Sequence, residues 1–342
     1  MKEIKEELKF NVQIYKMVLV VRMIYVKKKV MLIIAICLIQ FLIVSCIQKP
    51  ENSELETTID ENYYKNKAVV ISTVADVFKE TDLSSERLTQ ALFNQEVTVL
   101  GSDGGWSKVR AADGHIGWIR TKSIDENCRS IMDELYTDRI VVTGKTKKIL
   151  NKPDGKVTVK DVVMGTELYI VNVKENYYEV ALPKNTTGWV ERKDTIVVPA
   201  KQSITKTSGK DLATTVNKFI NTAYLSGGIS TWEGIDSTGL VYICCKINGI
   251  EFLREDFLDY YNFKGQDISI QNIEPGDLIF LNNGKDREKV FEVGIFIGEN
   301  QFVYASKSEG VVVDSVQKER FQHNLMGIKR IFDSSSVSEE TF

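Results

Sequence analysis

Residues 234–241 read G-I-D-S-T-G-L-V and decide the fold of the C-terminal part of the chain. They lead into the apolar run 240–245, which is typical of a buried helix. We therefore expect a helix over 238–246, with Ser237 at its start. A serine hydroxyl is a weak nucleophile unless a neighbouring base takes its proton. The chemistry of this segment therefore depends on which side chains the fold brings to Ser237.

Residues 234–241 resemble the nucleophile segment of the NlpC/P60 cell-wall peptidases, which usually reads G-x-D-C-S-G-L-V, and Ser237 stands in place of the cysteine. Residues 293–298, V-G-I-F-I-G, resemble the family strand H-V-G-I-Y-L-G, and Glu292 stands in place of the catalytic histidine. Residues 303–306, V-Y-A-S, resemble the I-H-A-S segment, and Tyr304 stands in place of the third polar residue. The resemblance implies a peptidase frame whose catalytic groups are replaced.

These three replacements argue against cysteine-peptidase chemistry. Such an enzyme needs a thiolate, a base and a group that orients the base. Glu292 is anionic near neutral pH unless burial raises its pKa, and it cannot supply an imidazolium. Tyr304, with an ordinary pKa of about 10, is not a base at neutral pH. In an alternative interpretation the domain still hydrolyses peptides, with Ser237 as the nucleophile and Glu292 as a general base whose pKa is strongly raised.

The remaining histidines and cysteines offer no replacement for the missing groups. The sequence contains two histidines, His115 and His323, and we expect both at turn or surface positions. Cys244 and Cys245 lie about two helical turns, some 10–12 Å, beyond Ser237, so we expect them in the core. No Cys/His cluster suggests a metal site, and we expect neither a metal nor a cofactor.

The resemblance extends from about 211 to 332. Residues 224–228, Y-L-S-G-G, resemble the family's Y-x-W-G-G loop, and 274–280 resemble its P-G-D-L-V-F turn and strand. Short apolar runs predict buried strands at 278–281, 293–297 and 302–304, and helical spacing of apolar residues predicts a helix over 212–225. The implied fold is α+β: a papain-like domain over 208–334, with helices on an antiparallel sheet, followed by a disordered tail at 335–342.

The N-terminal region predicts export. Residues 27–29 are lysines, 30–44 are apolar except for one glutamine, and 42–46 read L-I-V-S-C. This order is typical of a signal peptide, and its end resembles the bacterial lipobox, in which the cysteine, here Cys46, is lipidated after cleavage. The apolar run is shorter than the ~20 residues of a spanning helix, although an uncleaved single-pass anchor is the alternative.

We therefore expect a signal peptide within 1–46, a polar tether over 47–66 and a lipid-anchored protein in the cell envelope. Met23 begins a more usual signal peptide than Met1, so we expect translation to start at Met23. Sequencing the unprocessed precursor tests this, and residues 1–22 in the product would refute it.

Two small β domains are expected between the tether and the C-terminal domain, over 67–127 and 137–198. Both contain β-branched and aromatic runs between Gly, Asp and Asn turns, and each has a Gly-Trp pair near its end, at 117–118 and 188–189. They resemble bacterial SH3 barrels. We expect Trp106, Trp118 and Trp189 in the barrel cores rather than on a ligand platform.

Two SH3 domains before an NlpC/P60 domain resemble the γ-D-glutamyl-L-diamino acid endopeptidases, in which the first SH3 domain helps to close the groove. We predict a lipid-anchored, catalytically degenerate relative that binds peptidoglycan peptides or an envelope partner. The groove candidates are Tyr224, Asp236, Ser237, Glu292 and Tyr304. The alternatives are an active endopeptidase that uses Ser237, and a purely structural domain. The net charge of −3, without a basic stripe, gives no sign of nucleic-acid binding.

Overall fold

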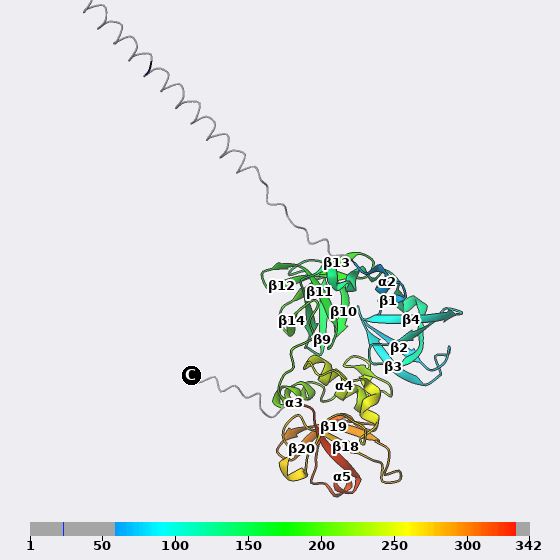
Figure 1. The fold of residues 1–342 in the computed structure, drawn as a ribbon, viewed down its shortest axis with the longest axis vertical. Helices are drawn as coiled ribbons and strands as arrows, with labels where there is room; N and C mark the ends of the chain where they lie inside the picture. Colours follow the sequence, from blue (N-terminus) through cyan, green and yellow to red (C-terminus); the bar gives the residue numbers. More distant parts are fainter. Residues whose placement is uncertain (1–22, 24–58, 333–342) are drawn as a thin grey trace, which may run out of the picture. The chain divides into compact units, whose positions relative to one another are not determined.

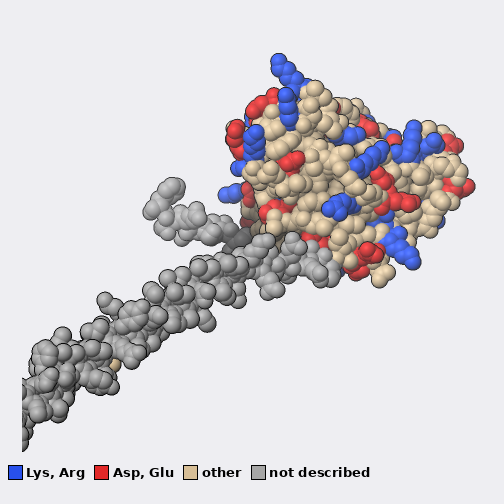
Figure 2. Space-filling view, turned by 90° about the horizontal axis from the view of Figure 1, so that it is seen from above, with Lys and Arg blue, Asp and Glu red and all other residues tan. Residues whose placement is uncertain are grey.

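The computed structural model describes residue 23 and residues 59–332. The predictions for the signal peptide, Cys46, the tether before residue 59 and the tail therefore lie outside the described residues. In the described part, no helix has the length and apolar character needed to cross a membrane. Charges of both signs are interspersed on the face shown in Figure 2.

The two small β domains repeat one strand order. The first sheet has the order β3-β2-β6-β5-β4-β1-β7, and the second has β10-β9-β13-β12-β11-β8-β14, which is the same order shifted by seven strands. The first contains β1 (Lys67–Val70), β2 (Val74–Phe78), β3 (Arg87–Leu92), β4 (Glu96–Asp103), β5 (Trp106–Arg110), β6 (Ile116–Arg120) and β7 (Ile124–Asp125), after the short helix α2 (Glu61–Tyr64). The second contains β8 (Asp138–Val142), β9 (Thr146–Leu150), β10 (Thr158–Val163), β11 (Glu167–Lys174), β12 (Tyr177–Leu182), β13 (Thr186–Glu191) and β14 (Thr195–Pro199). The two segments, which share a Gly-Trp pair near their ends, thus have the same topology.

The Gly-Trp pairs lie where two strands approach too closely for a side chain. A Cβ on Gly117 would lie 2.5 Å from the Phe78 carbonyl oxygen and 2.8 Å from Val77 Cγ1, and a Cβ on Gly188 would collide with Ile149. Of the tryptophans, Trp106 is buried, whereas Trp118 and Trp189 are half-buried.

Alanine at these two glycines is expected to destabilise its domain. Gly117→Ala or Gly188→Ala should lower the free energy of unfolding by about 1–3 kcal/mol, because the added methyl group forces strands or side chains apart. Gly101→Ala in β4 is the matched control, since no atom lies within 4 Å of its Cβ position. Denaturant unfolding of the three variants checks this, and equal midpoints would contradict it.

The C-terminal domain packs helices on a six-stranded antiparallel sheet (Figure 1). The sheet order is β17-β22-β18-β19-β20-β21, and both α3 and α4 contact β19. Its elements are α3 (Gly209–Asn217), β15 (Ile229–Ser230), β16 (Gly234–Ile235), α4 (Ser237–Ile247), β17 (Gln266–Asp267), β18 (Leu278–Leu281), β19 (Glu292–Gly298), β20 (Gln301–Ser306), β21 (Gly310–Ser315), α5 (Glu319–Asn324) and β22 (Leu325–Arg330), with single 3₁₀ turns at η4 (Arg254–Leu258) and η5 (Ile270–Asn272). The papain-like arrangement itself stays a prediction.

The predicted strands at 278–281, 293–297 and 302–304 are confirmed, and the helix expected over 238–246 is α4. The helix expected over 212–225 is wrong in its second half, because α3 ends at Asn217. Asn221 adopts a left-handed φ of 69°, and Tyr224 then forms a β-bridge with Ile235. The apolar residues after α3 keep helical spacing because they contact the core, with Phe219 fully buried.

A half-buried ion-pair cluster joins the second β domain to α4. Glu167 of β11 lies 2.7 Å from Arg139 Nε of β8 and 2.9 Å from Lys246 Nζ of α4. Burial alone would raise the pKa of Glu167, but the two cations and their hydrogen bonds lower it on balance. A carboxyl group whose folded-state pKa is lowered stabilises the fold above its ordinary pKa, and this contribution is lost as the pH falls through the folded-state value.

Glu167→Gln is therefore expected to destabilise the protein most at neutral pH. The difference in Tm between parent and variant should shrink as the pH falls below the ordinary glutamate pKa of 4.5. Thermal unfolding at pH 7 and pH 3 measures it, with the exposed Glu126→Gln as control. A difference that stays constant with pH would show that the charge of Glu167 is not what stabilises this junction.

Candidate functional site

Asp236 caps the N-terminus of α4 and fixes the loop before it. Its Oδ1 accepts hydrogen bonds from Gly239 N at 2.8 Å and Thr238 Oγ1 at 3.0 Å, and its Oδ2 accepts one from Gly227 N at 2.8 Å. Ser237 follows as the first residue of the helix and is buried. An N-cap of this kind satisfies backbone N–H groups that the helix leaves free. The serine is therefore held at the positive end of the helix dipole.

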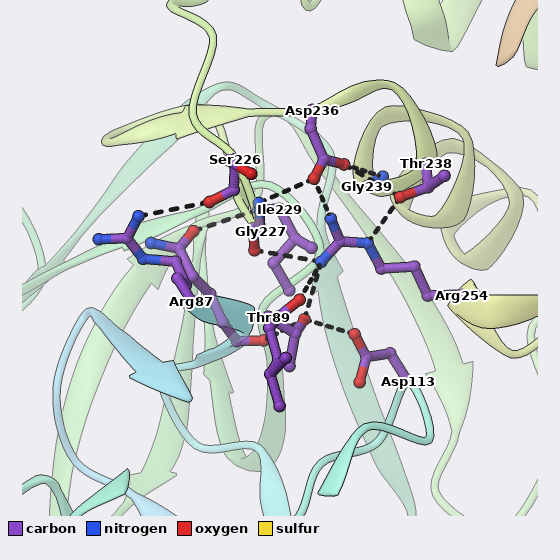
Figure 3. A network of polar contacts seen from close by, with 12 residues as sticks. Arg87, Thr89, Asp113, Ser226, Gly227, Ile229, Asp236, Thr238, Gly239 and Arg254 are labelled. Carbon is purple, nitrogen blue, oxygen red and sulfur yellow. Dashed lines mark hydrogen bonds and ion pairs between the residues drawn. The ribbon is translucent and has the colours of Figure 1, made fainter. Parts of the chain in front are cut away.

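Arg254 joins this helix terminus to the first β domain (Figure 3). Its guanidinium is 3% exposed and forms an ion pair with Asp236 Oδ2. It also donates to Thr238 Oγ1 at 3.0 Å and to the Gly227 carbonyl oxygen at 3.1 Å. From β3 of the first domain, Thr89 Oγ1 accepts a further bond at 3.0 Å. One buried cation thus links three separate segments of the chain.

The network continues into the first β domain. Thr89 donates to Asp113, whose carboxylate lies 3.2 Å from His115 Nδ1. Burial would raise the pKa of Asp113, but hydrogen bonds from His115 and Thr89, with the charges of His115 and Arg254, lower it on balance. The side chains of Asp113 and Arg254 are therefore linked across the two domains through the Thr89 hydroxyl. No sequence motif predicts this link, because Asp113 and Arg254 lie more than a hundred residues apart.

Glu292 and Tyr224 are two candidate residues that influence one another electrostatically. Glu292 begins β19 opposite Leu281, and burial raises its pKa while the charge of Arg320 opposes the rise. Burial also raises the pKa of the half-buried Tyr224, and the negative charges of Asp236 and Glu292 add to this effect. The structure therefore brings Tyr224, Asp236 and Glu292 into one electrostatic environment.

Tyr304 was expected to line the peptide groove, but its side chain packs in an aromatic cluster of the core. It is 2% exposed, its ring stacks on Phe302 with centroids 5.1 Å apart, and Phe321 packs edge-on at 5.7 Å. Arg320 Nη2 donates to its hydroxyl oxygen at 2.7 Å. Burial raises its pKa, as does the charge of Glu292, whereas Arg320 lowers it. Tyr304 is therefore a neutral core residue near Glu292, and its direct contact with a ligand stays a prediction.

Asp236 also has a structural role that the sequence did not reveal. Four donors of the chain itself, including Arg254, already bind its two carboxylate oxygens. A ligand would have to compete with these donors. Ser237, Glu292 and Tyr224 are thus the candidate residues with the fewest internal hydrogen bonds, and their roles in binding stay predictions.

Neither histidine contacts Ser237 among the described residues. His115 lies in the turn between β5 and β6, where its Nε2 is 3.8 Å from Glu255. His323 lies on α5, 4.0 Å from Glu319, and its side chain is 71% exposed. Cys244 and Cys245 are buried, as expected, and burial raises the pKa of both thiols. No group of three or more His, Cys, Asp or Glu side chains suited to a metal ion occurs within residues 59–332.

Comparison with known families now identifies the domains. Residues 221–330 match the NlpC/P60 family, residues 77–124 match the bacterial dipeptidyl-peptidase SH3 domain, and residues 133–195 match the GW (Gly-Tryp) dipeptide domain.

Individual relatives agree with these matches. The chain is 27% identical over 229 residues to the γ-D-glutamyl-L-lysine dipeptidyl-peptidase of Bacillus cereus, covering 65% of this chain and 68% of that relative. It is 33% identical over 113 residues to the murein DD-endopeptidase MepS/murein LD-carboxypeptidase of Escherichia coli, covering 33% of this chain and 57% of that relative. A crystal structure of an NlpC/P60 family protein from Bacillus cereus has the same fold, with a TM-score of 0.71 and 21% identity over 78% of this chain and all of that chain. The C-terminal domain of the chain thus belongs to the NlpC/P60 family, and two small SH3-like domains precede it.

Proposed function

We propose that this chain is a lipid-anchored protein of the cell envelope whose NlpC/P60 domain binds cell-wall peptides without cleaving them. The observation that carries the proposal is the combination at the start of α4. The cap, the glycine loop and the Arg254 bridge hold Ser237 in place, but among the described residues no imidazole or thiol forms a hydrogen bond with it.

The preserved parts favour binding. Asp236 and Arg254 hold the 227–228 loop against the helix terminus, so the site has a fixed shape. A helix N-terminus attracts carboxylates, and Ser237 adds a hydroxyl that donates or accepts a hydrogen bond. Tyr224 and Glu292 add a second hydroxyl and a negative charge. These groups suit a peptide that bears both a carboxylate and an amine.

The replaced parts argue against hydrolysis. General acid–base catalysis usually contributes about 10²–10⁴-fold, and histidine supplies it most often. Burial raises the pKa of Glu292 and the charge of Arg320 opposes the rise, but a carboxyl group supplies no imidazolium in either protonation state. Tyr304 is neutral and engaged with Arg320 in the core. No group is thus positioned as the orienter that a serine–base pair needs.

The relatives suggest the ligand class. One is named for γ-D-glutamyl-L-lysine and the other for murein, so we propose γ-linked stem peptides of peptidoglycan as the ligands. Lipid attachment at Cys46 would hold the domain at the membrane surface, and replacement of Cys46 by alanine would then release it to the soluble fraction. Retention of that variant at the membrane would favour an uncleaved anchor instead.

Loss of the Tyr224 side chain is expected to weaken binding of L-Ala-γ-D-Glu-L-Lys at least about tenfold, the size typical of an aromatic residue at the centre of a binding site. Calorimetric titration of parent and Tyr224→Ala measures this. Tyr261→Ala is the matched control, because that ring is 66% exposed and lies outside the site. Equal affinity of parent and Tyr224→Ala would mean that the peptide does not bind in this groove.

A second candidate function is slow hydrolysis with Ser237 as nucleophile. One observation favours it, since burial raises the pKa of Glu292, which is the direction that a general base at neutral pH requires. Product formation that is abolished in both Ser237→Ala and Glu292→Gln would establish this candidate. Hydrolysis that persists in both variants would exclude Ser237 and Glu292 as the catalytic pair.

A further inference from the structure

A large cleft lies at the far end of α4 from Ser237. Its volume is about 1140 Å³, and it is lined by β8 and β11 of the second β domain, by the linker 200–204, by the C-terminal half of α4 and by residues 249–264. Lys246 lies nine residues, or ~14 Å along the helix, from Ser237, and none of Tyr224, Ser237 and Glu292 lines the cleft, so the cleft is separate from the candidate site. Small-molecule sites occur preferentially at domain junctions and typically measure about 300–1,000 Å³.

The inner wall of the cleft offers more hydrogen-bond donors than the protein itself uses. Tyr242 is 6% exposed, and no described residue forms a hydrogen bond with its hydroxyl. Arg139 is 8% exposed, and its Nε and Nη1 bind Glu167 and two carbonyl oxygens, while no described residue accepts from Nη2. Lys246 Nζ binds Glu167 at 2.9 Å and has two further N–H groups. Two cations, one carboxylate and a tyrosine hydroxyl leave a net positive wall that suits a carboxylate.

The outer wall has the opposite charge balance. Two lysines, Lys201 and Lys264, line the cleft together with five carboxylates, and all are exposed except the half-buried Asp133; the carboxylates are those of Asp133, Glu251, Glu255, Asp256 and Asp259. Phe252 and Phe263 stack with ring centroids 4.8 Å apart and supply an apolar side. The rim is therefore net negative and suits an ammonium group, and the stacked rings suit an uncharged segment between the two charged ends.

We propose that this cleft binds a short zwitterionic peptide. Its carboxylate lies toward Tyr242, Lys246 and Arg139, and its ammonium group lies among the rim carboxylates. This site is distinct from the groove at Ser237 and does not depend on what that groove binds. Because β8, β11, the linker 200–204, α4 and residues 249–264 all line the cleft, an occupied site stabilises their junction, and the gain rises with the logarithm of the ligand concentration above the dissociation constant.

The test uses the full chain in detergent and trialanine as the probe, since it has both charged ends and no γ-glutamyl bond. Calorimetric titration should show saturable binding of trialanine. Trialanine amide and N-acetyl-trialanine should each bind at least about tenfold more weakly, because each leaves one charged wall without a partner. Tyr242→Phe, which removes only the hydroxyl, should weaken binding of trialanine about three- to tenfold. Tyr63→Ala, at an exposed tyrosine that does not line the cleft, should leave it unchanged.

Three results would overturn the proposal. The first is the absence of saturable heat up to about 10 mM trialanine, where even weak specific binding is measurable. The second is an equal affinity for trialanine and for the two blocked peptides. The third is a loss of trialanine binding in Tyr224→Ala rather than in Tyr242→Phe. Thermal unfolding of Tyr242→Phe confirms that the variant folds. An unchanged affinity in a folded Tyr242→Phe would exclude the proposed orientation of the carboxylate.

Discussion

Arg254→Ala is expected to lower the free energy of unfolding by about 3–5 kcal/mol, because it removes one partner of a buried ion pair and leaves Asp236 with an uncompensated charge. It also leaves Thr89 Oγ1 and the Gly227 carbonyl oxygen without their shared donor. Since Arg254 joins α4 to the first β domain, we expect the two parts to unfold less cooperatively in this variant. Calorimetry with parent and variant measures both effects.

Two further variants separate the charge from the rest of the side chain. Arg287→Ala is the surface control, because Arg287 is exposed and forms no ion pair among the described residues. Adding Asp236→Asn to Arg254→Ala should recover part of the lost stability, since it removes the unpaired charge. A loss below about 1 kcal/mol in Arg254→Ala, which is the usual size for an exposed pair, would show that the bridge does not hold the helix terminus as described.

Ser237→Cys combined with Glu292→His is expected to create hydrolysis of L-Ala-γ-D-Glu-L-Lys where the parent gives none. A cysteine at a helix N-terminus next to an imidazolium has a lowered pKa and reacts as a thiolate. The cap, the glycine loop and the Arg254 bridge that such a residue requires are already in place. Mass spectrometry of the peptide after incubation with parent, each single variant and the double variant measures the gain.

Adding Tyr304→His to this pair is expected to cost stability. The Tyr304 ring fills a closed aromatic cluster with Phe302 and Phe321, and its hydroxyl accepts a hydrogen bond from Arg320. A smaller ring leaves part of this space unfilled, at a cost of about 1–3 kcal/mol. Activity in the double variant but a lower Tm in the triple variant is the expected pattern. No activity in either would mean that the groove no longer presents a γ-linked peptide to residue 237.

The sequence predicted those parts of the fold that depend on local pattern. The strand at 278–281 and the helix α4 are continuous apolar runs bounded by turn residues, so their limits were visible. The end of α3 could not be predicted in this way. Phe219 and Ile220 continue the helical spacing of apolar residues, although the helix has already ended at Asn217. Their apolar character reflects burial in the core, which a turn can supply as well as a helix.

The candidate site was predicted from motifs, and its role stays a prediction. Ser237, Glu292 and Tyr224 were placed by motif, and the structure brings Asp236 and Glu292 within electrostatic reach of Tyr224. Arg254, Thr89 and Asp113 could not be found in this way. Their contacts depend on how the first β domain packs against the helix terminus, and pairing over such sequence distances leaves no local signal. Tyr304 illustrates the converse, since its motif position suggested a groove residue and the structure places it in a closed core.

One measurement tests the central claim, that the NlpC/P60 domain binds but does not cleave. Residues 47–342 are incubated at stoichiometric concentration with L-Ala-γ-D-Glu-meso-diaminopimelate, and the products are analysed by mass spectrometry, with Ser237→Ala in parallel. We predict that the peptide remains intact with both proteins and that the parent still binds it in a calorimetric titration. Cleavage by the parent that disappears in Ser237→Ala would contradict the claim and establish the chain as a serine-dependent peptidase.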